Sequence, residues 1–196
     1  MTRLTILFTL LLGISMTGQS QDWSDVHNTG RKHGYGIVGN TGPELRDNIQ
    51  WVDGNGKATT ANKLGDAKTN YKVIYGFQAW CPGCHSRGLP SLKKMVNELE
   101  GNDKVSFMAI QTVFEGSASN TYERMQEIQK EYDLQIPFGH DPGDATSRNR
   151  SGTMVDYRTG GTPWFIILDE NNKVVFNDYH LDTDKAIEIL KEATEE

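Results

Sequence analysis

Hydrophobic residues along the chain occur either in near-continuous runs or at helical spacing, and these two patterns predict the strands and helices. Near-continuous apolar and aromatic runs over 71–78 (YKVIYGFQ) and 104–113 (KVSFMAIQTV) predict two buried strands. Between these runs, apolar residues recur at helical spacing, at Leu89, Leu92, Met95, Val96 and Leu99. The pattern therefore predicts a strand, a helix and a second strand in that order.

The second half of the chain continues this alternation. Asn120 and Glu123 have the spacing of a helix start. The runs 162–168 and 173–179 flank the turn signal DENN and predict an antiparallel hairpin, and the stretch from Asp182 onward predicts a closing helix. The polar and aromatic segments between these elements are expected to be loops, namely 112–121 and 136–161, with His140 and Asp141 as turn residues.

Ahead of these elements, residues 49–59 contain DGNG and predict a β-hairpin. Residues 21–48 are rich in glycine and polar side chains, so we expect an extension with little regular structure. Strands alternating with helices predict an α/β layered sheet. The expected organisation is an N-terminal segment 1–20, a Gly-rich extension 21–48 and one α/β domain over 49–196 that begins with the hairpin.

The first twenty residues have the layout of a secretory signal peptide. Arg3 precedes an apolar run from Leu4 to Met16, and a small-x-small triplet, Gly18-Gln19-Ser20, precedes the predicted cut before Gln21. The run is shorter than the roughly 20 residues that a membrane span needs. We therefore expect export, to the periplasm, and a mature protein without a stable membrane span. The alternative is an uncleaved N-terminal anchor.

Composition and charge narrow the classes of function. The chain is 36% hydrophobic and 23% charged, which is typical of a globular protein, and its formal net charge is −6. An acidic chain without a long basic run is a poor candidate for binding nucleic acid. The only two cysteines are Cys81 and Cys84. A disulfide between them would close too small a loop to stabilise the fold, so a reactive pair is the stronger interpretation.

The Cys-x-x-Cys pair is predicted to lie where a buried strand meets the start of a helix. Unsatisfied N–H groups there stabilise a thiolate, which is the species that attacks a disulfide. We assign the attacking role to Cys81, expected to be partly exposed, and the resolving role to Cys84, expected to be more buried. Pro82 preorganises the turn, and Trp80 would shield the site and contact substrate.

His85 follows directly, so the same residues also match the Cys-x-x-Cys-His signature of covalent c-type haem attachment, with His85 as axial ligand. We favour the dithiol because at least four strands are predicted, whereas small haem domains are mostly helical. His85 then lies near the thiols and could tune them. His27 and His33 lack a third ligand nearby in sequence, so no metal site is predicted.

A second motif, Thr162-Pro163, opens a buried strand about 80 residues after the cysteines. Together with Trp80-Cys81-Pro82-Gly83-Cys84 after an apolar strand, it resembles the thioredoxin superfamily over residues 45–196. The signal peptide and the early hairpin resemble the exported TlpA-like/ResA-like branch and the related redoxins. The resemblance implies a thioredoxin-like fold, with a central mixed sheet flanked by helices. It also implies a cis bond before Pro163, facing the dithiol, and substrate pairing with the backbone of Thr162.

The chain departs from that pattern near the cysteines. Many exported members have a glutamate where this chain has Arg87, and thioredoxins have a buried aspartate where it has Tyr75. No carboxylate is thus clearly placed to accept the Cys84 proton, and Glu115 is a candidate by location only. Arg87 could instead lower a thiol pKa through its charge.

The residues and the resemblance predict an exported thiol-disulfide oxidoreductase that acts on protein disulfides in the reducing direction. Its redox group would be the Cys81–Cys84 disulfide, without a further cofactor, and its partners would be protein disulfides or dithiols and a redox partner protein. One alternative is a thiol peroxidase of the redoxin type. Gln78, where that branch usually has threonine, argues against it. A non-catalytic binding module and the haem protein are the more remote alternatives.

Overall fold

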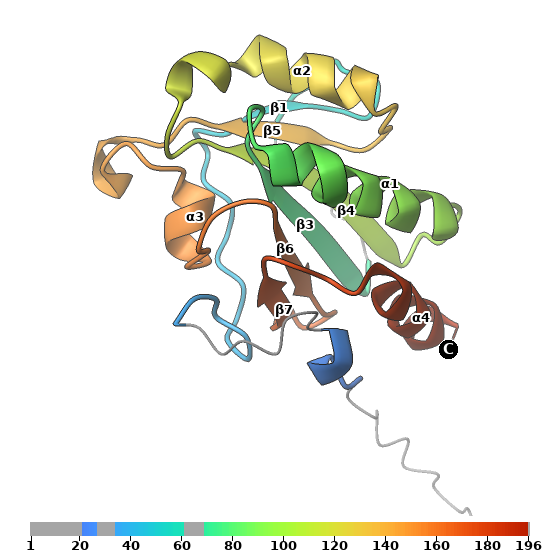
Figure 1. Cartoon of the computed structure of the whole chain (residues 1–196). Helices are drawn as coiled ribbons and strands as arrows, with labels where there is room; N and C mark the ends of the chain where they lie inside the picture. The colour runs from blue at the N-terminus through green and yellow to red at the C-terminus, as the bar shows by residue number, and fades with distance from the viewer. Residues whose placement is uncertain (1–20, 27–33, 61–68, 196) are drawn as a thin grey trace, which may run out of the picture.

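The computed structural model describes residues 21–26, 34–60 and 69–195, and one seven-stranded sheet forms its centre (Figure 1). The strand order is β2-β1-β5-β4-β3-β6-β7. The strands are β1 (Gln50–Val52), β2 (Ala58–Thr59), β3 (Tyr71–Phe77), β4 (Val105–Thr112), β5 (Phe138–Asp141), β6 (Trp164–Leu168) and β7 (Val174–Asp178).

The sheet is mixed. Its centre is parallel, because β3 pairs with β4 and β4 with β5 in the same direction. The flanking pairs are antiparallel, namely β3 with β6, β6 with β7, β5 with β1, and β1 with β2. This confirms the predicted mixed α/β sheet and the predicted hairpin at 49–59, in which Trp51 lies opposite Thr59.

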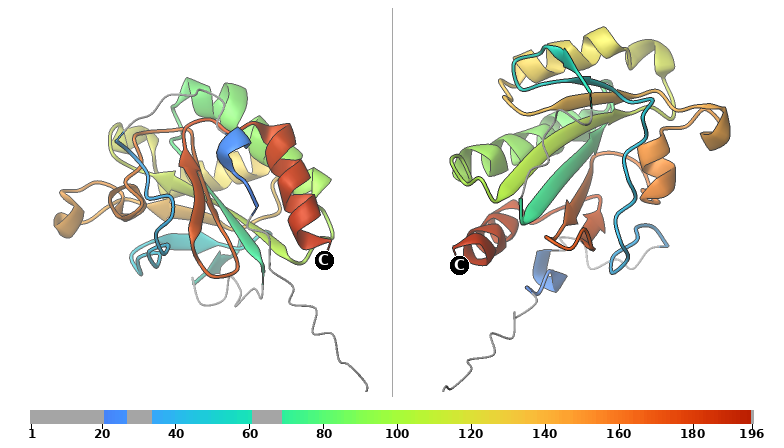
Figure 2. Two further views of the ribbon diagram at one scale, coloured as in Figure 1. Left: turned by 90° about the horizontal axis from the view of Figure 1, so that it is seen from below. Right: turned by 180° about the vertical axis from the view of Figure 1, so that it is seen from behind.

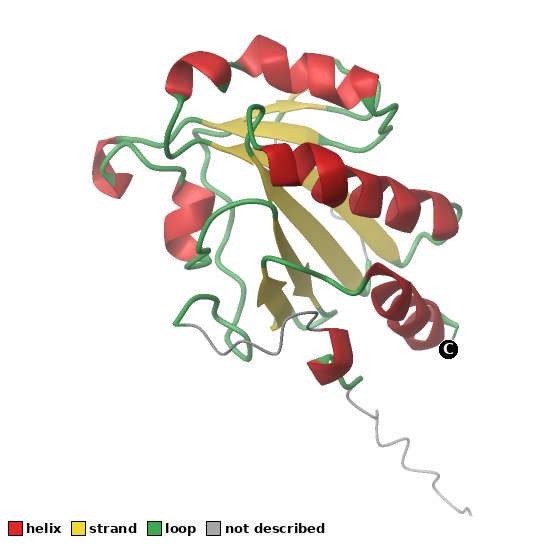
Figure 3. Cartoon of the chain, viewed as in Figure 1, coloured by secondary structure: helices red, strands yellow, loops and turns green. Residues whose placement is uncertain are grey.

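Helices cover both faces of the sheet (Figures 1 and 3). They are α1 (Leu89–Glu98), α2 (Tyr122–Glu131), α3 (Gly152–Asp156) and α4 (Thr183–Thr194). Buried residues of α1, α2 and α4 share one hydrophobic core with the side chains of Tyr75, Phe77 and Phe138. The second core, on the other face, contains Tyr157, just after α3, and Trp164.

The N-terminal extension packs against the domain although it has little regular structure. A 3-10 turn, η1 (Ser24–Val26), buries Val26 in the first core, and the segment from residue 34 onward crosses the second face toward β1 (Figure 2). Arg46 anchors this segment through hydrogen bonds of 2.7 Å from both Nε and Nη2 to the Asp156 carboxylate. The predicted signal peptide, His27 and His33 lie outside the described residues. Among the residues that are described, no helix is both long and apolar enough to cross a bilayer.

The predicted loop at 136–161 is wrong in part, because it contains strand β5 and helix α3. His140 and Asp141 are buried strand residues rather than turn residues. Their polar groups are satisfied by tertiary partners: His140 Nδ1 lies 2.6 Å from Gln111 Oε1, and the Asp141 carboxylate accepts hydrogen bonds from the Ser151 hydroxyl and the Thr153 backbone N–H. Hydrophobic pattern alone could not reveal a strand whose polar residues are buried in this way.

The start of α2 also differs from the prediction by one residue. Thr121, not Asn120, is the N-cap, and its hydroxyl accepts a hydrogen bond from the backbone N–H of Arg124. Asn120 is instead buried beside the dithiol segment, where its side chain has other partners.

Candidate active site: a buried dithiol beside a cis-proline loop

The two cysteines lie where β3 ends and the helical layer begins. Cys84 opens a π-helical turn, η3 (Cys84–Gly88), which leads into α1. Both residues are free thiols. Cys81 is only 7% exposed, so it is more buried than expected, and Cys84 is completely buried. As predicted, Cys81 is the more exposed of the two cysteines.

The Cys81 sulfur makes two polar contacts. It accepts the backbone N–H of Cys84 at 3.3 Å, a donor of the first helical turn that is shared with the Cys81 backbone oxygen at 3.1 Å. Its own S–H donates to the backbone oxygen of Thr162 at 3.6 Å. The Thr162–Pro163 bond is cis, and the Pro163 ring packs against Gly83. The structure therefore brings together the two motifs that the sequence places far apart.

Cys84 is held as a neutral thiol. Burial, followed by the hydrogen bond with Cys81, raises the pKa of Cys84 to about 12. Two groups act in the opposite direction, because hydrogen bonds from the Gln78 backbone and the Thr162 side chain lower this pKa. Cys84 can therefore attack as a thiolate only when neighbouring hydrogen-bond donors stabilise its negative charge.

Asn120, which the sequence did not single out for the site, ties the dithiol segment to the loop before α2. Its Oδ1 accepts the Ala79 N–H at 2.7 Å, and its Nδ2 donates to Gln78 Oε1 at 3.0 Å. The indole N–H of Trp80 donates to the same Gln78 oxygen at 3.2 Å, while the ring stays 44% exposed. Trp80 thus lies at the surface beside Cys81 in an orientation set by Gln78.

His85 contacts Tyr132 at the end of α2 and the backbone of Ala79. Its Nε2 lies 2.7 Å from the backbone oxygen of Ala79, and its Nδ1 lies 2.9 Å from the Tyr132 hydroxyl. Both ring nitrogens have partners within the fold. The haem alternative would require one of these bonds to break.

The other two candidate tuning residues are exposed. Arg87 lies on the π-helical turn, and its charge acts on His180, whose pKa is lowered first by burial and then by Arg87. Glu115 is exposed in the loop after β4, and its backbone oxygen accepts a hydrogen bond from Asn120 Nδ2. The structure thus places the Glu115 carboxylate in solvent, whereas Cys84 is fully buried.

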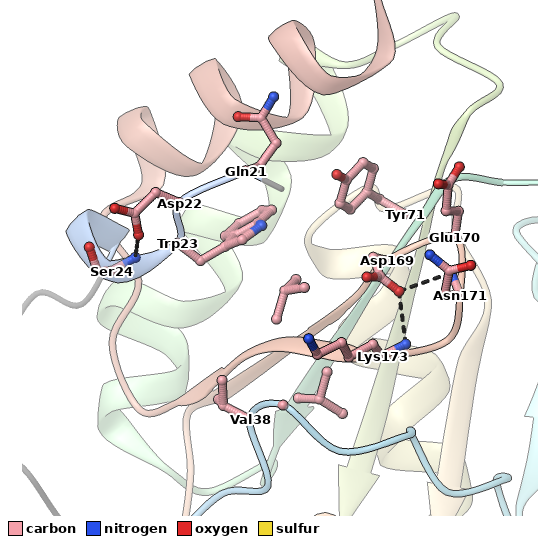
Figure 4. Close-up of a pocket in the computed structure, with 13 residues that line it drawn as sticks. Gln21, Asp22, Trp23, Ser24, Val38, Tyr71, Asp169, Glu170, Asn171 and Lys173 are labelled. Carbon is pink, nitrogen blue, oxygen red and sulfur yellow. Dashed lines mark hydrogen bonds between the residues drawn. The ribbon is translucent and has the colours of Figure 1, made fainter. Parts of the chain in front are cut away.

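Two hollows differ in their relation to the dithiol. A pocket of about 360 Å³ adjoins Trp80 and is lined by Ala79, Ala118, Ser119, Thr121 and Arg124. A larger one, of about 640 Å³, lies between the N-terminal segment at Trp23, the start of β3 at Tyr71 and the β6–β7 turn at Asp169 (Figure 4). It is at the opposite end of β3 from Cys81, whereas the smaller pocket is lined by Ala79 and Trp80, which directly precede Cys81 in the chain. Among the described residues, no three His, Cys, Asp or Glu side chains are grouped as metal ligands.

The chain matches the family model described as Redoxin over residues 37–193. Among solved structures it is similar to a thioredoxin-like superfamily protein, with 29% identity and a TM-score of 0.63 over 78% of this chain and 96% of that one. It is also similar to a thiol-disulfide isomerase from Corynebacterium glutamicum, with 25% identity and a TM-score of 0.65 over 79% and 97% of the two chains. No curated protein matches the chain.

A more distant likeness bears on the fold alone. A protein described as a putative disulfide isomerase from Bacteroides thetaiotaomicron is 17% identical, with a TM-score of 0.58 over 83% of this chain and 94% of that one. The fold is therefore thioredoxin-like, as the sequence predicted. The family match and the Corynebacterium glutamicum neighbour support a thioredoxin-like oxidoreductase function at a general level.

Proposed function

The chain belongs to the Redoxin family, and from this premise we propose that it is an extracytoplasmic thiol-disulfide oxidoreductase that reduces disulfides in other proteins. The observation that carries the proposal is the contact between Cys81 and Thr162. A sulfur with a helix N–H on one side and the backbone oxygen of the cis-proline loop on the other can attack a disulfide that is held by that loop.

The order of the two steps follows from burial. Cys81 attacks the substrate disulfide, forms a mixed disulfide and releases the first substrate sulfur as a thiol. Cys84 then attacks the Cys81 sulfur, which forms the Cys81–Cys84 disulfide and releases the second substrate sulfur. Two electrons pass from the dithiol to the substrate, and a redox partner protein must return them. Thr162, Pro163 and the exposed Trp80 are the proposed contacts with substrate.

Location and direction rest on the sequence. The apolar run and triplet before Gln21 support export to the periplasm, and the resemblance to the exported TlpA-like branch supports the reducing direction. The thiol-disulfide isomerase among the neighbours is consistent with a protein substrate.

A redox titration of the Cys81–Cys84 pair, read by thiol trapping and mass spectrometry, tests the direction. A reduction potential near the value of about −270 mV known for thioredoxin supports a reductant, whereas one near about −120 mV would support a disulfide donor instead. Rapid turnover with hydrogen peroxide would favour a thiol peroxidase and contradict the proposal.

Trapping in cells tests the substrate class. In the Cys84→Ser variant, mixed disulfides between Cys81 and exported proteins should accumulate, because the resolving thiol is missing. The matched Cys81→Ser variant should trap none. Equal trapping by the two variants, or trapping by neither, would contradict the assigned roles.

A further inference from the structure

A buried tyrosine hydroxyl contacts the backbone of Cys84. Tyr75 is in the middle of β3, opposite Ala109 and Phe165, and is fully buried. Its ring stacks on Phe77 at a centroid distance of 5.9 Å and contacts Phe165 at 4.8 Å. These neighbours hold the ring, so its hydroxyl is directed at the π-helical turn that begins with Cys84.

The hydroxyl is enclosed by groups of the active site. It donates to the backbone oxygen of Cys84 at 3.4 Å, the same oxygen that accepts the Leu89 N–H. Gly88 lacks a side chain where the hydroxyl lies: a Cβ added there would overlap the Tyr75 oxygen and would be 2.8 Å from Pro163 Cβ. A buried hydroxyl is thus packed between Cys84, Gly88 and Pro163.

The hydrogen bond from this hydroxyl to the backbone of Cys84 is weak. A distance of 3.4 Å is longer than the roughly 2.5–3.0 Å usual between two oxygens, so the bond to the Cys84 carbonyl is weak. Burial first, and then the charge of Cys84 and a hydrogen bond with its side chain, raise the pKa of Tyr75 well above its ordinary value. The hydroxyl therefore stays protonated and can only be a donor to a charged sulfur.

We propose that Tyr75 is a positioning residue for the resolving step, in which its hydroxyl donates a hydrogen bond to the Cys84 sulfur as that sulfur becomes a thiolate. The inference rests on the proposed function. Cys84 releases its proton to solvent and attacks Cys81. The Cys81–Cys84 bond forms, the bond from Cys81 to the substrate breaks, and the leaving substrate sulfur takes up a proton. Tyr75 keeps its own proton throughout.

The two steps can be observed separately in the reduced full chain with dithiobis(nitrobenzoic acid). The attack by Cys81 releases one coloured thiolate, and the attack by Cys84 on the mixed disulfide releases a second. In Tyr75→Phe we expect an unchanged first phase and a second phase roughly tenfold to a hundredfold slower, the range for losing a hydrogen bond to a charged group. The pH dependence of the second phase should also move to higher pH.

Tyr132→Phe is the matched control. The Tyr132 hydroxyl lies 2.9 Å from His85 Nδ1 and 3.3 Å from the His85 backbone oxygen, the next carbonyl of the same turn. Tyr132→Phe therefore removes a tyrosine hydroxyl that contacts the π-helical turn, but it keeps the Tyr75 hydroxyl that contacts Cys84. Both phases should keep the wild-type rates and pH dependence, and a selectively slowed second phase in this control would contradict the assignment to Tyr75.

Two results would overturn the inference: a second phase in Tyr75→Phe with the wild-type rate and pH profile, or equal slowing of both phases. Absence of the first phase from the wild-type protein would overturn the proposed function instead. Should Tyr75→Phe not fold, 3-fluorotyrosine can be incorporated at position 75 in the Tyr132→Phe background. This more acidic phenol is a stronger donor, so the second phase should become faster, and an unchanged rate would overturn the inference.

Discussion

The Cys81 sulfur lies 3.6 Å from the backbone oxygen of Thr162, a residue 81 positions later in the chain. Strand register produces this contact. Gly76 at the end of β3 is opposite Trp164 at the start of β6. The segment that follows β3 and the segment that precedes β6 therefore meet at the same end of these two strands. A substrate sulfur that reaches Cys81 must therefore also approach the Thr162 backbone.

The two thiols should differ in their reaction with limiting iodoacetamide. Cys81 retains 7% exposure, whereas Cys84 is fully buried and has a pKa raised by burial to about 12, which leaves little thiolate. We expect peptide mass spectrometry to find Cys81 alkylated well before Cys84. In denaturant both should react at similar rates. Faster labelling of Cys84 in the folded protein would contradict the assigned roles.

Stability should depend on pH through Cys84. Because burial raises its pKa from 9.0 to about 12, the unfolded chain loses this proton at lower pH than the folded one. The stability that this group contributes is complete below about pH 9 and is lost as pH rises toward about 12. In Cys81→Ser, we expect the free energy of unfolding to fall in this range by up to about 1.4 kcal/mol per pH unit.

Urea denaturation of Cys81→Ser over this range of pH measures that slope. The matched control is Cys81→Ser/Cys84→Ala, which has no thiol but keeps every other titrating group. Its free energy of unfolding should fall less steeply with pH. Parallel slopes for the two variants would show that Cys84 is not held neutral by burial.

Asn120→Ala should destabilise the fold and loosen the segment before Cys81. The substitution leaves the buried Ala79 N–H without its acceptor and removes the donor to Gln78, so we expect a loss of about 2–4 kcal/mol in the free energy of unfolding. Asn120→Asp should lose at least as much, because its buried carboxylate would face the Gln78, Glu115 and Gly116 oxygens that Nδ2 now serves as donor. Chemical denaturation measures both, and the exposed neighbour Ser119→Ala should change stability by less than about 0.5 kcal/mol. A similar small effect for Asn120→Ala would contradict the role of this side chain.

Asp141→Asn should release the segment 142–153 from the sheet. The Asp141 carboxylate accepts from the Ser151 hydroxyl at 2.6 Å and from the Thr153 backbone N–H at 2.8 Å, and an amide cannot accept all of the donors around it. We expect a loss of at least about 2 kcal/mol and faster proteolysis within the segment. Asp103→Asn, at an exposed turn before β4, should have a smaller effect on both measurements. Equal effects would mean that Asp141 is not the anchor.

Most of the fold could be predicted from local pattern, because the apolar runs of β3, β4, β6 and β7 and the apolar face of α1 are the surfaces that the core buries. The exceptions are β5 and α3, both within the segment 136–161 that was expected to be a loop. Phe138–Asp141 ends in two polar residues whose partners, Gln111 and Ser151, belong to other segments, so no local signal marks it as a strand. The N-cap of α2 is one residue later than predicted for the same reason, since the Asn120 side chain accepts the N–H of the distant Ala79.

For the site, local pattern alone was sufficient to find the two thiols, their place at a strand end and the proline motif, because each of these is a short contiguous signal. Tertiary packing decided the rest: that Thr162 meets Cys81, that His85 contacts Tyr132, and that the Tyr75 hydroxyl contacts the backbone of Cys84. Such contacts depend on strand register and on which face a helix buries. Residues distant in the chain become neighbours only when the whole sheet has formed.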